Sequence, residues 1–174
     1  MSVTICSLLW DAKRHGARTQ KISYDSDGYH LVRFPYGASD ENYDPWRMHD
    51  PANGGGTPSA FPDARSGLIW PSHEGWGVLS AMVFWAADSR PNEYRARFVR
   101  DPLSSAGGYD STATTDTWKT GGGQYKTYMW QIFVHPGTPV GLKISARASG
   151  DTKVPAPITH AQFKLAIHTD VKRP

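Results

Sequence analysis

Apolar and polar residues alternate along several short stretches of this chain. The clearest stretches are residues 92–100, 140–148 and 161–169. In the first of them, Tyr94, Ala96 and Phe98 alternate with polar residues, mostly arginines. Successive side chains of a strand point to opposite faces, so a period of two predicts a strand with one face in the core and the other toward water.

Two further stretches, residues 77–87 and 125–135, are apolar at most positions of both faces. This pattern is typical of strands that are covered on both sides. Shorter candidate strands lie at residues 21–24, 30–34, 68–70 and 109–118. Gly, Pro, Asp and Ser separate the stretches, and the segments between them lack the period of an amphipathic helix. The sequence therefore predicts an all-β fold, an antiparallel β-sandwich or jelly roll.

Two segments lie outside this alternating pattern. Residues 35–65 hold several prolines and three consecutive glycines, and a loop of this length is usually functional or packed against another element. Residues 1–18 are predicted to form an N-terminal arm that precedes a jelly-roll domain at 19–174. The apolar side chains that would anchor the arm are Val3, Ile5, Leu8, Leu9 and Trp10. The arm could add a strand to the domain's own sheet or dock on a neighbouring chain, and the sequence leaves both alternatives open.

Composition narrows the class of protein. A length of 174 residues suits a single domain, and 17 Gly with 13 Pro argue against a helical bundle. The net charge of +3 is too small to indicate a nucleic-acid partner. The single cysteine, Cys6, allows no internal disulfide, and we expect it to be a small buried side chain. The sequence has neither a signal-peptide pattern nor an apolar run of ~18–20 residues, so we expect folding in a reducing cytoplasm without membrane insertion.

Sequence signatures of catalysis are absent. The glycine triplets at 54–56 and 121–123 lack the lysine of a phosphate-binding loop, and no GxSxG motif occurs. The seven histidines have no metal-ligand spacing. Carboxylates between Asp40 and Asp50 could offer oxygen ligands to Ca²⁺, although a solvated loop explains them as well. We therefore expect no catalytic residue, no metal and no cofactor; a hydrolase would need carboxylates or histidines clustered in a cleft.

Aromatic residues indicate a contact surface. Seven Trp and eight Tyr need a place in the core or at an interface. Four tryptophans lie in or near predicted loops: Trp46, Trp70, Trp76 and Trp118. They could stack on sugar rings, or they could pack at an interface or within the loops. The candidate ligand-binding loop carries Tyr43, Trp46 and His49.

Four motifs follow one another in a particular order. They are residues 44–50, an Asp followed by a Met-His-Asp turn; residues 75–85, an apolar strand that begins with Gly; residues 134–144, a strand before an Ala-Ser-Gly turn; and residues 162–165, a closing strand. Arg95 and Arg97 lie between the second and the third motif. This order resembles the C1q/TNF-like jelly-roll domains of structural proteins of tailed bacteriophages, particularly those of actinobacteria. The resemblance covers residues 18–171, nearly the whole chain.

The resemblance implies a non-enzymatic component of a tailed-phage virion, assembled in the host cytoplasm. Such jelly rolls are usually homotrimers, which implies a subunit interface around a threefold axis with Phe84, Tyr128 and Trp130 as its residues. The arm would attach the trimer to other virion proteins on the tail or capsid scaffold, as in a minor tail protein or a capsid decoration protein. Two alternatives remain: a host-surface carbohydrate-binding adhesin module, and a monomeric sandwich that buries both faces of its apolar strands within itself.

Overall fold

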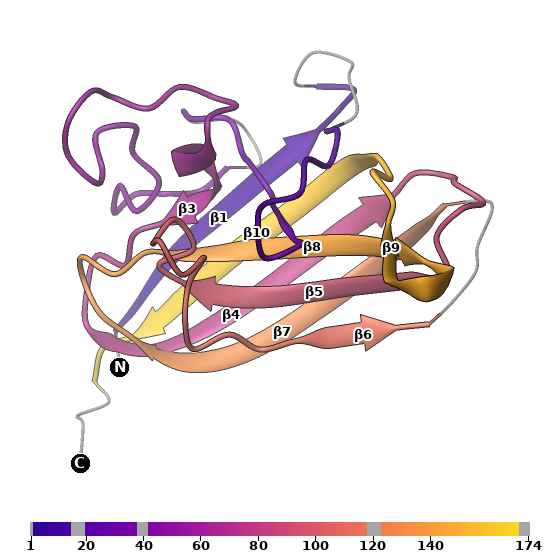
Figure 1. Ribbon diagram of the computed structural model, residues 1–174. Helices are drawn as coiled ribbons and strands as arrows, with labels where there is room; N and C mark the ends of the chain where they lie inside the picture. The colour runs from indigo at the N-terminus through magenta and orange to yellow at the C-terminus, as the bar shows by residue number, and fades with distance from the viewer. Residues whose placement is uncertain (1, 15–19, 38–41, 118–122, 171–174) are drawn as a thin grey trace.

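The computed structural model describes residues 2–14, 20–37, 42–117 and 123–170. In these residues two antiparallel β-sheets pack face to face, as Figure 1 shows. The four-stranded sheet has the order β1 (Val3–Asp11), β10 (Ile158–His168), β4 (Gly75–Trp85) and β7 (Gln124–Val134). The main path of the six-stranded sheet has the order β2 (His30–Leu31), β8 (Val140–Ala148), β5 (Glu93–Arg100) and β6 (Thr114–Asp116). The remaining strands, β3 (Leu68–Ile69) and β9 (Thr152–Lys153), also pair with β8.

The predicted all-β sandwich is confirmed. The strands β5, β8 and β10 come from the alternating stretches of the sequence, and β8 has the predicted bounds. The strands β4 and β7 come from the two stretches that are apolar on both faces. The two short 3-10 helices are η1 (Ala64–Gly67) and η2 (Ser149–Asp151). No helix in the described part of the chain has the length and hydropathy needed to span a membrane.

The core lies between the two sheets. One row of side chains crosses the four-stranded sheet, with Leu8 opposite Phe163, Phe163 opposite Ala81, and Ala81 opposite Tyr128. All four side chains are buried. From the other sheet, the ring of Phe98 stacks on that of Phe163 with 5.9 Å between centroids. Because side chains alternate between the two faces of each strand, each sheet has one inward face of apolar side chains. The inward side chains of the two sheets pack against each other.

Residues 3–11 form a strand of the domain and not a separate arm. All nine residues of β1 pair with β10. Among the predicted anchoring residues, Leu8, Leu9 and Trp10 are buried, whereas Val3 is half-buried and Ile5 is exposed. Of the two alternatives, the structure has the strand added to the domain's own sheet, because this placement buries the apolar side chains. Residue 1 and residues 15–18 of the predicted arm lie outside the described residues.

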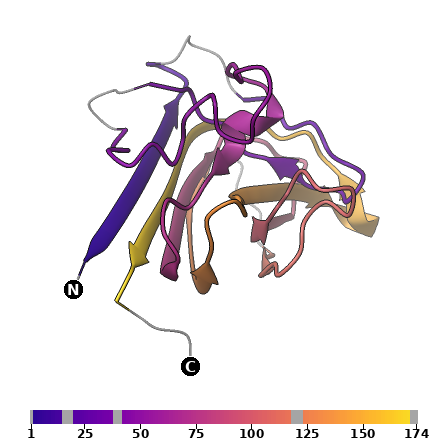
Figure 2. The same ribbon diagram turned by 90° about the vertical axis from the view of Figure 1, so that its left-hand side faces the viewer.

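The segment between β2 and β3 covers the opening between the two sheets beside β1, as Figure 2 shows. Tyr43 makes an isolated antiparallel bridge with Ser7 of β1, and the segment ends at β3, which pairs with β8. Met48 is fully buried in the core. The described part of residues 35–65 contains no strand, as the sequence predicts. This long loop is thus packed over the sandwich and tied to both sheets.

The outer face of the six-stranded sheet is covered by the chain itself. Along β8, Lys143, Ser145 and Arg147 alternate with core residues and yet are buried. The Lys143 ammonium group lies 2.7 Å from the Asp27 carboxylate and donates to the carbonyl oxygen of Gly107 at 2.9 Å. The alternation predicts a solvent-facing row at these positions, but ion pairs and hydrogen bonds to the segments around residues 27 and 107 allow the charged groups to be buried.

Candidate functional site

The outer face of the four-stranded sheet carries several large apolar side chains that are exposed. We define this outer face by the outward side chains Ile5, Trp76, Met82, Phe84, Tyr125 and Met129. Four of them are largely exposed: Ile5 by 37%, Trp76 by 38%, Tyr125 by 60% and Met129 by 72%. Large exposed apolar side chains that share one face are typical of an interaction surface.

Polar groups lie among and around these apolar side chains. A shallow depression of about 460 Å³ in the middle of the outer face is lined by Met82 and Met129 together with Gln162 and Lys164. Near one end, the rings of Phe84 and Tyr125 lie 4.6 Å apart, and Tyr125 contacts His160 edge to face. An apolar centre with polar groups around it is the usual composition of a protein–protein interface.

The structure corrects the predicted subunit interface. Phe84 lies on the outer face and is half-buried. Tyr128 belongs to the core, where burial raises the pKa of its hydroxyl group, so the prediction is wrong for this residue. Trp130 points to the same side as Tyr128 and packs against the core while remaining partly exposed. In this strand the outward positions include those of Tyr125 and Met129.

The predicted ligand-binding loop begins with a turn held by Asp44. Its two carboxylate oxygens accept hydrogen bonds from the backbone N–H groups of Met48 at 2.8 Å and His49 at 2.7 Å. The buried Cys6 thiol also donates to Asp44, and burial together with this carboxylate raises the pKa of the thiol. Asp44 therefore holds the motif at residues 44–50 as a compact turn over β1. Cys6 is the small buried side chain that the sequence predicts.

The structure brings two of the three predicted loop residues together on the surface. The rings of Tyr43 and Trp46 meet edge to face with 6.3 Å between centroids, and both side chains are exposed. His49 is buried beneath them and stacks on Tyr36 at 4.5 Å. Its Nε2 atom donates to the carbonyl oxygen of Ser66 at 2.9 Å, and burial lowers the pKa of the imidazole. His49 is therefore a neutral ring whose Nδ1 atom is an acceptor.

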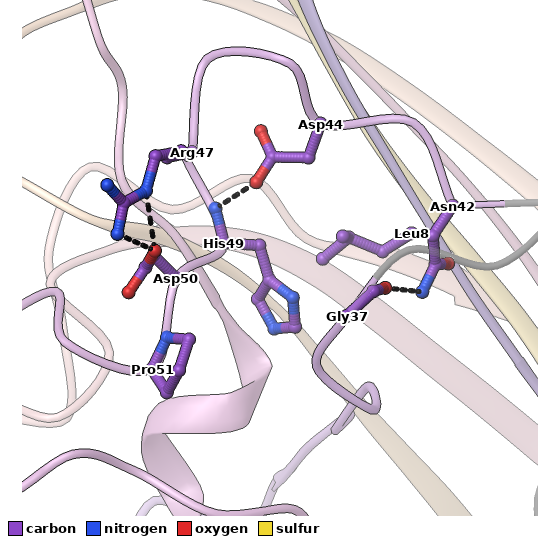
Figure 3. A pocket seen from close by; sticks show the side chains of 8 residues that line it. All are labelled: Leu8, Gly37, Asn42, Asp44, Arg47, His49, Asp50 and Pro51. Carbon is purple, nitrogen blue, oxygen red and sulfur yellow. Dashed lines mark hydrogen bonds and ion pairs between the residues drawn. The ribbon is translucent and has the colours of Figure 1, made fainter.

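Two depressions flank an ion pair on this loop. The guanidinium of Arg47 contacts one carboxylate oxygen of Asp50 through Nε at 2.7 Å and Nη2 at 2.6 Å. The smaller depression, about 200 Å³, is shown in Figure 3; besides this pair it is lined by Leu8, Asn42, Asp44 and His49. The larger and shallower one, about 500 Å³, is lined by the same pair with Trp46, Asn53, Trp70 and Ser72. We call these two depressions and the exposed rings of Tyr43 and Trp46 the loop surface.

Sequence patterns missed part of the loop surface. Asp50 belongs to the Met-His-Asp motif, but no sequence pattern indicates its ion pair with Arg47. Trp70 is one of several loop tryptophans until the fold places it beside Trp46. The Ca²⁺ alternative gains no support. In the described part of the chain no three His, Cys, Asp or Glu side chains gather at metal-binding distance, and Asp40 and Glu41 lie outside it. Asp44 and Asp50 are engaged in the turn and the ion pair.

The fold and its strand order are those of a C1q/TNF-like jelly roll. The globular domain of zebrafish complement 1qA is similar with a TM-score of 0.58 and 12% identity, covering 98% of this chain and 99% of that chain. Murine APRIL at pH 5.0 has a TM-score of 0.52 and 10% identity, covering 96% of this chain and 100% of that one. Eiger TNF from S. frugiperda has a TM-score of 0.50 and 12% identity, with 98% and 97% covered.

These similarities show a shared fold and carry no information on function, because the sequence identities are 10–12%. No protein-family model matches the sequence, and no curated protein matches it. The predicted jelly roll of C1q/TNF type is confirmed. Nothing in the comparisons points to a bacteriophage.

Proposed function

We propose that this protein is a non-enzymatic assembly module that forms a homotrimer through the outer face of the four-stranded sheet. The uncovered apolar outer face carries this proposal. Trp76, Met129 and Tyr125 are exposed at successive places along the length of this face, with polar groups among them. Removing such apolar area from water contributes roughly 25 cal/mol per Å². In a monomer this exposed apolar area stays in contact with water and contributes no such free energy.

The contrast between the two sheets supports assembly. The outer face of the six-stranded sheet is polar and is covered by segments of the same chain, which pair Lys143 and Arg97 with Asp27. The outer face of the four-stranded sheet is apolar, and no described segment covers its exposed side chains. The described residues of one copy thus leave apolar side chains of these strands exposed, which supports association over a monomeric sandwich. Trimers are common among C1q/TNF-like domains, which supports a threefold arrangement.

We further propose that the trimer is a surface component of a tailed-phage virion, on the tail or on the capsid. The order of sequence motifs supports this location, and the jelly-roll fold is compatible with it. Leu8 and Trp10 are core residues, so the proposed attachment to the particle would use the outward side of β1, near Val3 and Ile5.

Light scattering on the purified protein tests the trimer. We expect a mass of about three times 19.2 kDa for the wild-type chain and a monomer for Met129→Glu, because the charge would enter the apolar interface. Leu103→Glu is the matched control, since Leu103 is exposed by 42% in a loop outside the outer face, and this variant should remain trimeric. A monomeric wild-type protein at micromolar concentration would overturn the proposal.

Mass spectrometry of purified particles tests the location. Peptides of this chain should be present in tailed-phage particles from a host that carries its gene, in a copy number divisible by three. Absence from the particles, with the protein abundant in the lysate, would rule out a virion component and leave the trimer proposal standing.

A further inference from the structure

Trp70 forms a fixed aromatic wall in the larger depression of the loop surface. Its backbone N–H donates to the carbonyl oxygen of Met48 at 2.7 Å. The backbone of Gly54 lies directly against the indole, and a Cβ atom there would come within 2.9 Å of the ring. Gly54 also has a φ of +85°, which favours glycine. The ring is thus held from one side by a close backbone approach while the residue remains half-exposed.

The loop around this ring is preorganised by hydrogen bonds. The Arg65 guanidinium donates to the carbonyl oxygens of Gly55 at 2.9 Å and of Thr57. The backbone N–H of Ser59 donates to the carbonyl oxygen of Pro51 at 2.8 Å. A binding surface that is already ordered loses little conformational entropy when a ligand arrives.

Arg47 has a backbone conformation that non-glycine residues rarely adopt. Its φ is +53°, and its carbonyl oxygen accepts a hydrogen bond from the Asn53 side chain at 2.9 Å. The pair that its side chain forms with Asp50 stands between the two depressions. Strained residues that the surroundings hold in place cluster at functional sites. Donor and acceptor atoms of this pair face both depressions.

The charge and chemistry of the lining groups select the class of ligand. Arg47 is the only cationic side chain among the described residues that line the two depressions, and Asp50 neutralises it. The remaining carboxylate, Asp44, accepts two backbone N–H hydrogen bonds. The surface therefore offers no excess of positive charge to a phosphate or a carboxylate. Aromatic rings next to alternating donors and acceptors suit a molecule that has apolar C–H faces and hydroxyl groups. Neutral sugars have both.

We propose that the loop surface binds a neutral oligosaccharide, with sugar rings packed on Trp46 and Trp70. Sugar hydroxyl groups hydrogen-bond with the Arg47 and Asp50 pair between the depressions. The smaller depression receives the next sugar, whose hydroxyl group donates to Nδ1 of His49. The two adjoining depressions indicate a ligand of at least two sugar units.

An array of neutral and acidic oligosaccharides, probed with the full-length protein, tests the inference. We expect binding to at least one neutral oligosaccharide, and binding that is about tenfold weaker or worse for Trp46→Ala, the order of loss seen when an aromatic stacking platform is removed. Tyr109→Ala is the matched control: Tyr109 is 48% exposed on another loop and lines neither depression, so this variant should bind as the wild type does. Light scattering on both variants should give the wild-type mass.

A titration followed by NMR locates the ligand. With the neutral oligosaccharide identified on the array, the indole N–H signals of Trp46 and Trp70 should shift, and that of the buried Trp85 should stay in place. The affinity should change by less than about twofold between low and high salt, because the ligand is uncharged. Binding of acidic saccharides only, binding of none, or an equal loss in Tyr109→Ala would each overturn the inference, whatever the oligomeric state proves to be.

Discussion

Lys143 has 1% of its side chain exposed, and its ammonium group lies among three oxygen-bearing neighbours: Asp27, Asp25 and Gly107. Burial alone would raise the pKa of Asp27, but the hydrogen bond and charge of Lys143 and the charge of Arg97 outweigh it, and the pKa is lowered. The Arg97 guanidinium also lies 4.0 Å from the centre of the Tyr29 ring. One carboxylate therefore holds two cations and fastens the segment around residue 27 over β8 and β5.

Substitution of Asp27 is expected to be costly. Asp27→Asn leaves the buried Lys143 without its closest charged partner, and removing one member of a buried pair costs about 3 kcal/mol or more. Urea denaturation measures the free energy of unfolding. Asp116→Asn is the control, because Asp116 pairs with Lys126 at 3.6 Å near the surface and its loss should cost less than about 1 kcal/mol. Equal urea midpoints for the two variants would contradict this account.

His30 makes the stability depend on pH. Burial lowers the pKa of this imidazole from 6.5 to about 4, and its neutral ring bonds to the Gln20 side chain at 3.0 Å. Between these two pH values the unfolded chain binds a proton that the folded chain does not, so stability falls as the pH drops. We expect the free energy of unfolding to be about 2 kcal/mol lower at pH 5 than at pH 7 from this group.

Chemical denaturation at the two pH values checks this prediction. His30→Gln should lose a large part of the pH dependence, whereas His73→Gln, at an exposed position, should retain it. An unfolding free energy that stays constant from pH 7 to pH 5 in the wild type would show that His30 is not protonated on unfolding.

At the scale of elements, substitutions in β1 test whether this strand is an integral part of the folded domain or an attached arm. Leu8 is 1% exposed and packs in the core, while Ile5 points outward in the same strand. We expect Leu8→Ala to reduce the free energy of unfolding by about 2–5 kcal/mol through the cavity that it leaves. Ile5→Ala should leave the unfolding of the monomer nearly unchanged. If both substitutions left stability unchanged, β1 would not belong to the folding unit.

The sequence predicts strands well where a period of two is long enough to be distinct. It places β5, β8 and β10 and puts Tyr94, Ala96 and Phe98 on one face of β5, which is the core side in the structure. It also finds β3 within the candidate strand at 68–70, but it does not find β9, because this two-residue strand is held by its partner β8 and has no period of its own. It also misplaces Tyr128, since both faces of β7 are rich in apolar residues and the register with β4 alone decides which one faces inward.

The candidate site is predicted only in part, for a similar reason. Tyr43, Trp46 and His49 are close in the sequence, so a loop that carries them is visible in advance. Trp70 reaches the same surface through the path of the long loop across the two sheets, which no local pattern encodes. Residues that meet through an irregular segment are found in three dimensions only.

At the scale of the whole molecule, the outer face of the six-stranded sheet is covered by the chain itself, whereas that of the four-stranded sheet is not. This difference makes thermal stability depend on protein concentration. If copies associate through the outer face, the folded state gains free energy by mass action, so the midpoint of thermal unfolding should rise with protein concentration. Scanning calorimetry over a hundredfold range of concentration measures this rise. In Met129→Glu the midpoint should be independent of concentration, and the same slope in both proteins would show that the outer face is not the interface.

Because Cys6 is buried, we expect the folded protein not to react with thiol reagents. It is the only cysteine of the chain, it is fully buried, and the raised pKa of its thiol keeps the reactive thiolate scarce. A cysteine introduced at the exposed position of Leu103 would therefore accept a fluorophore or spin label alone, with Cys6 left in place. In the unmodified chain, the rate at which Cys6 reacts with a thiol reagent measures how often β1 opens.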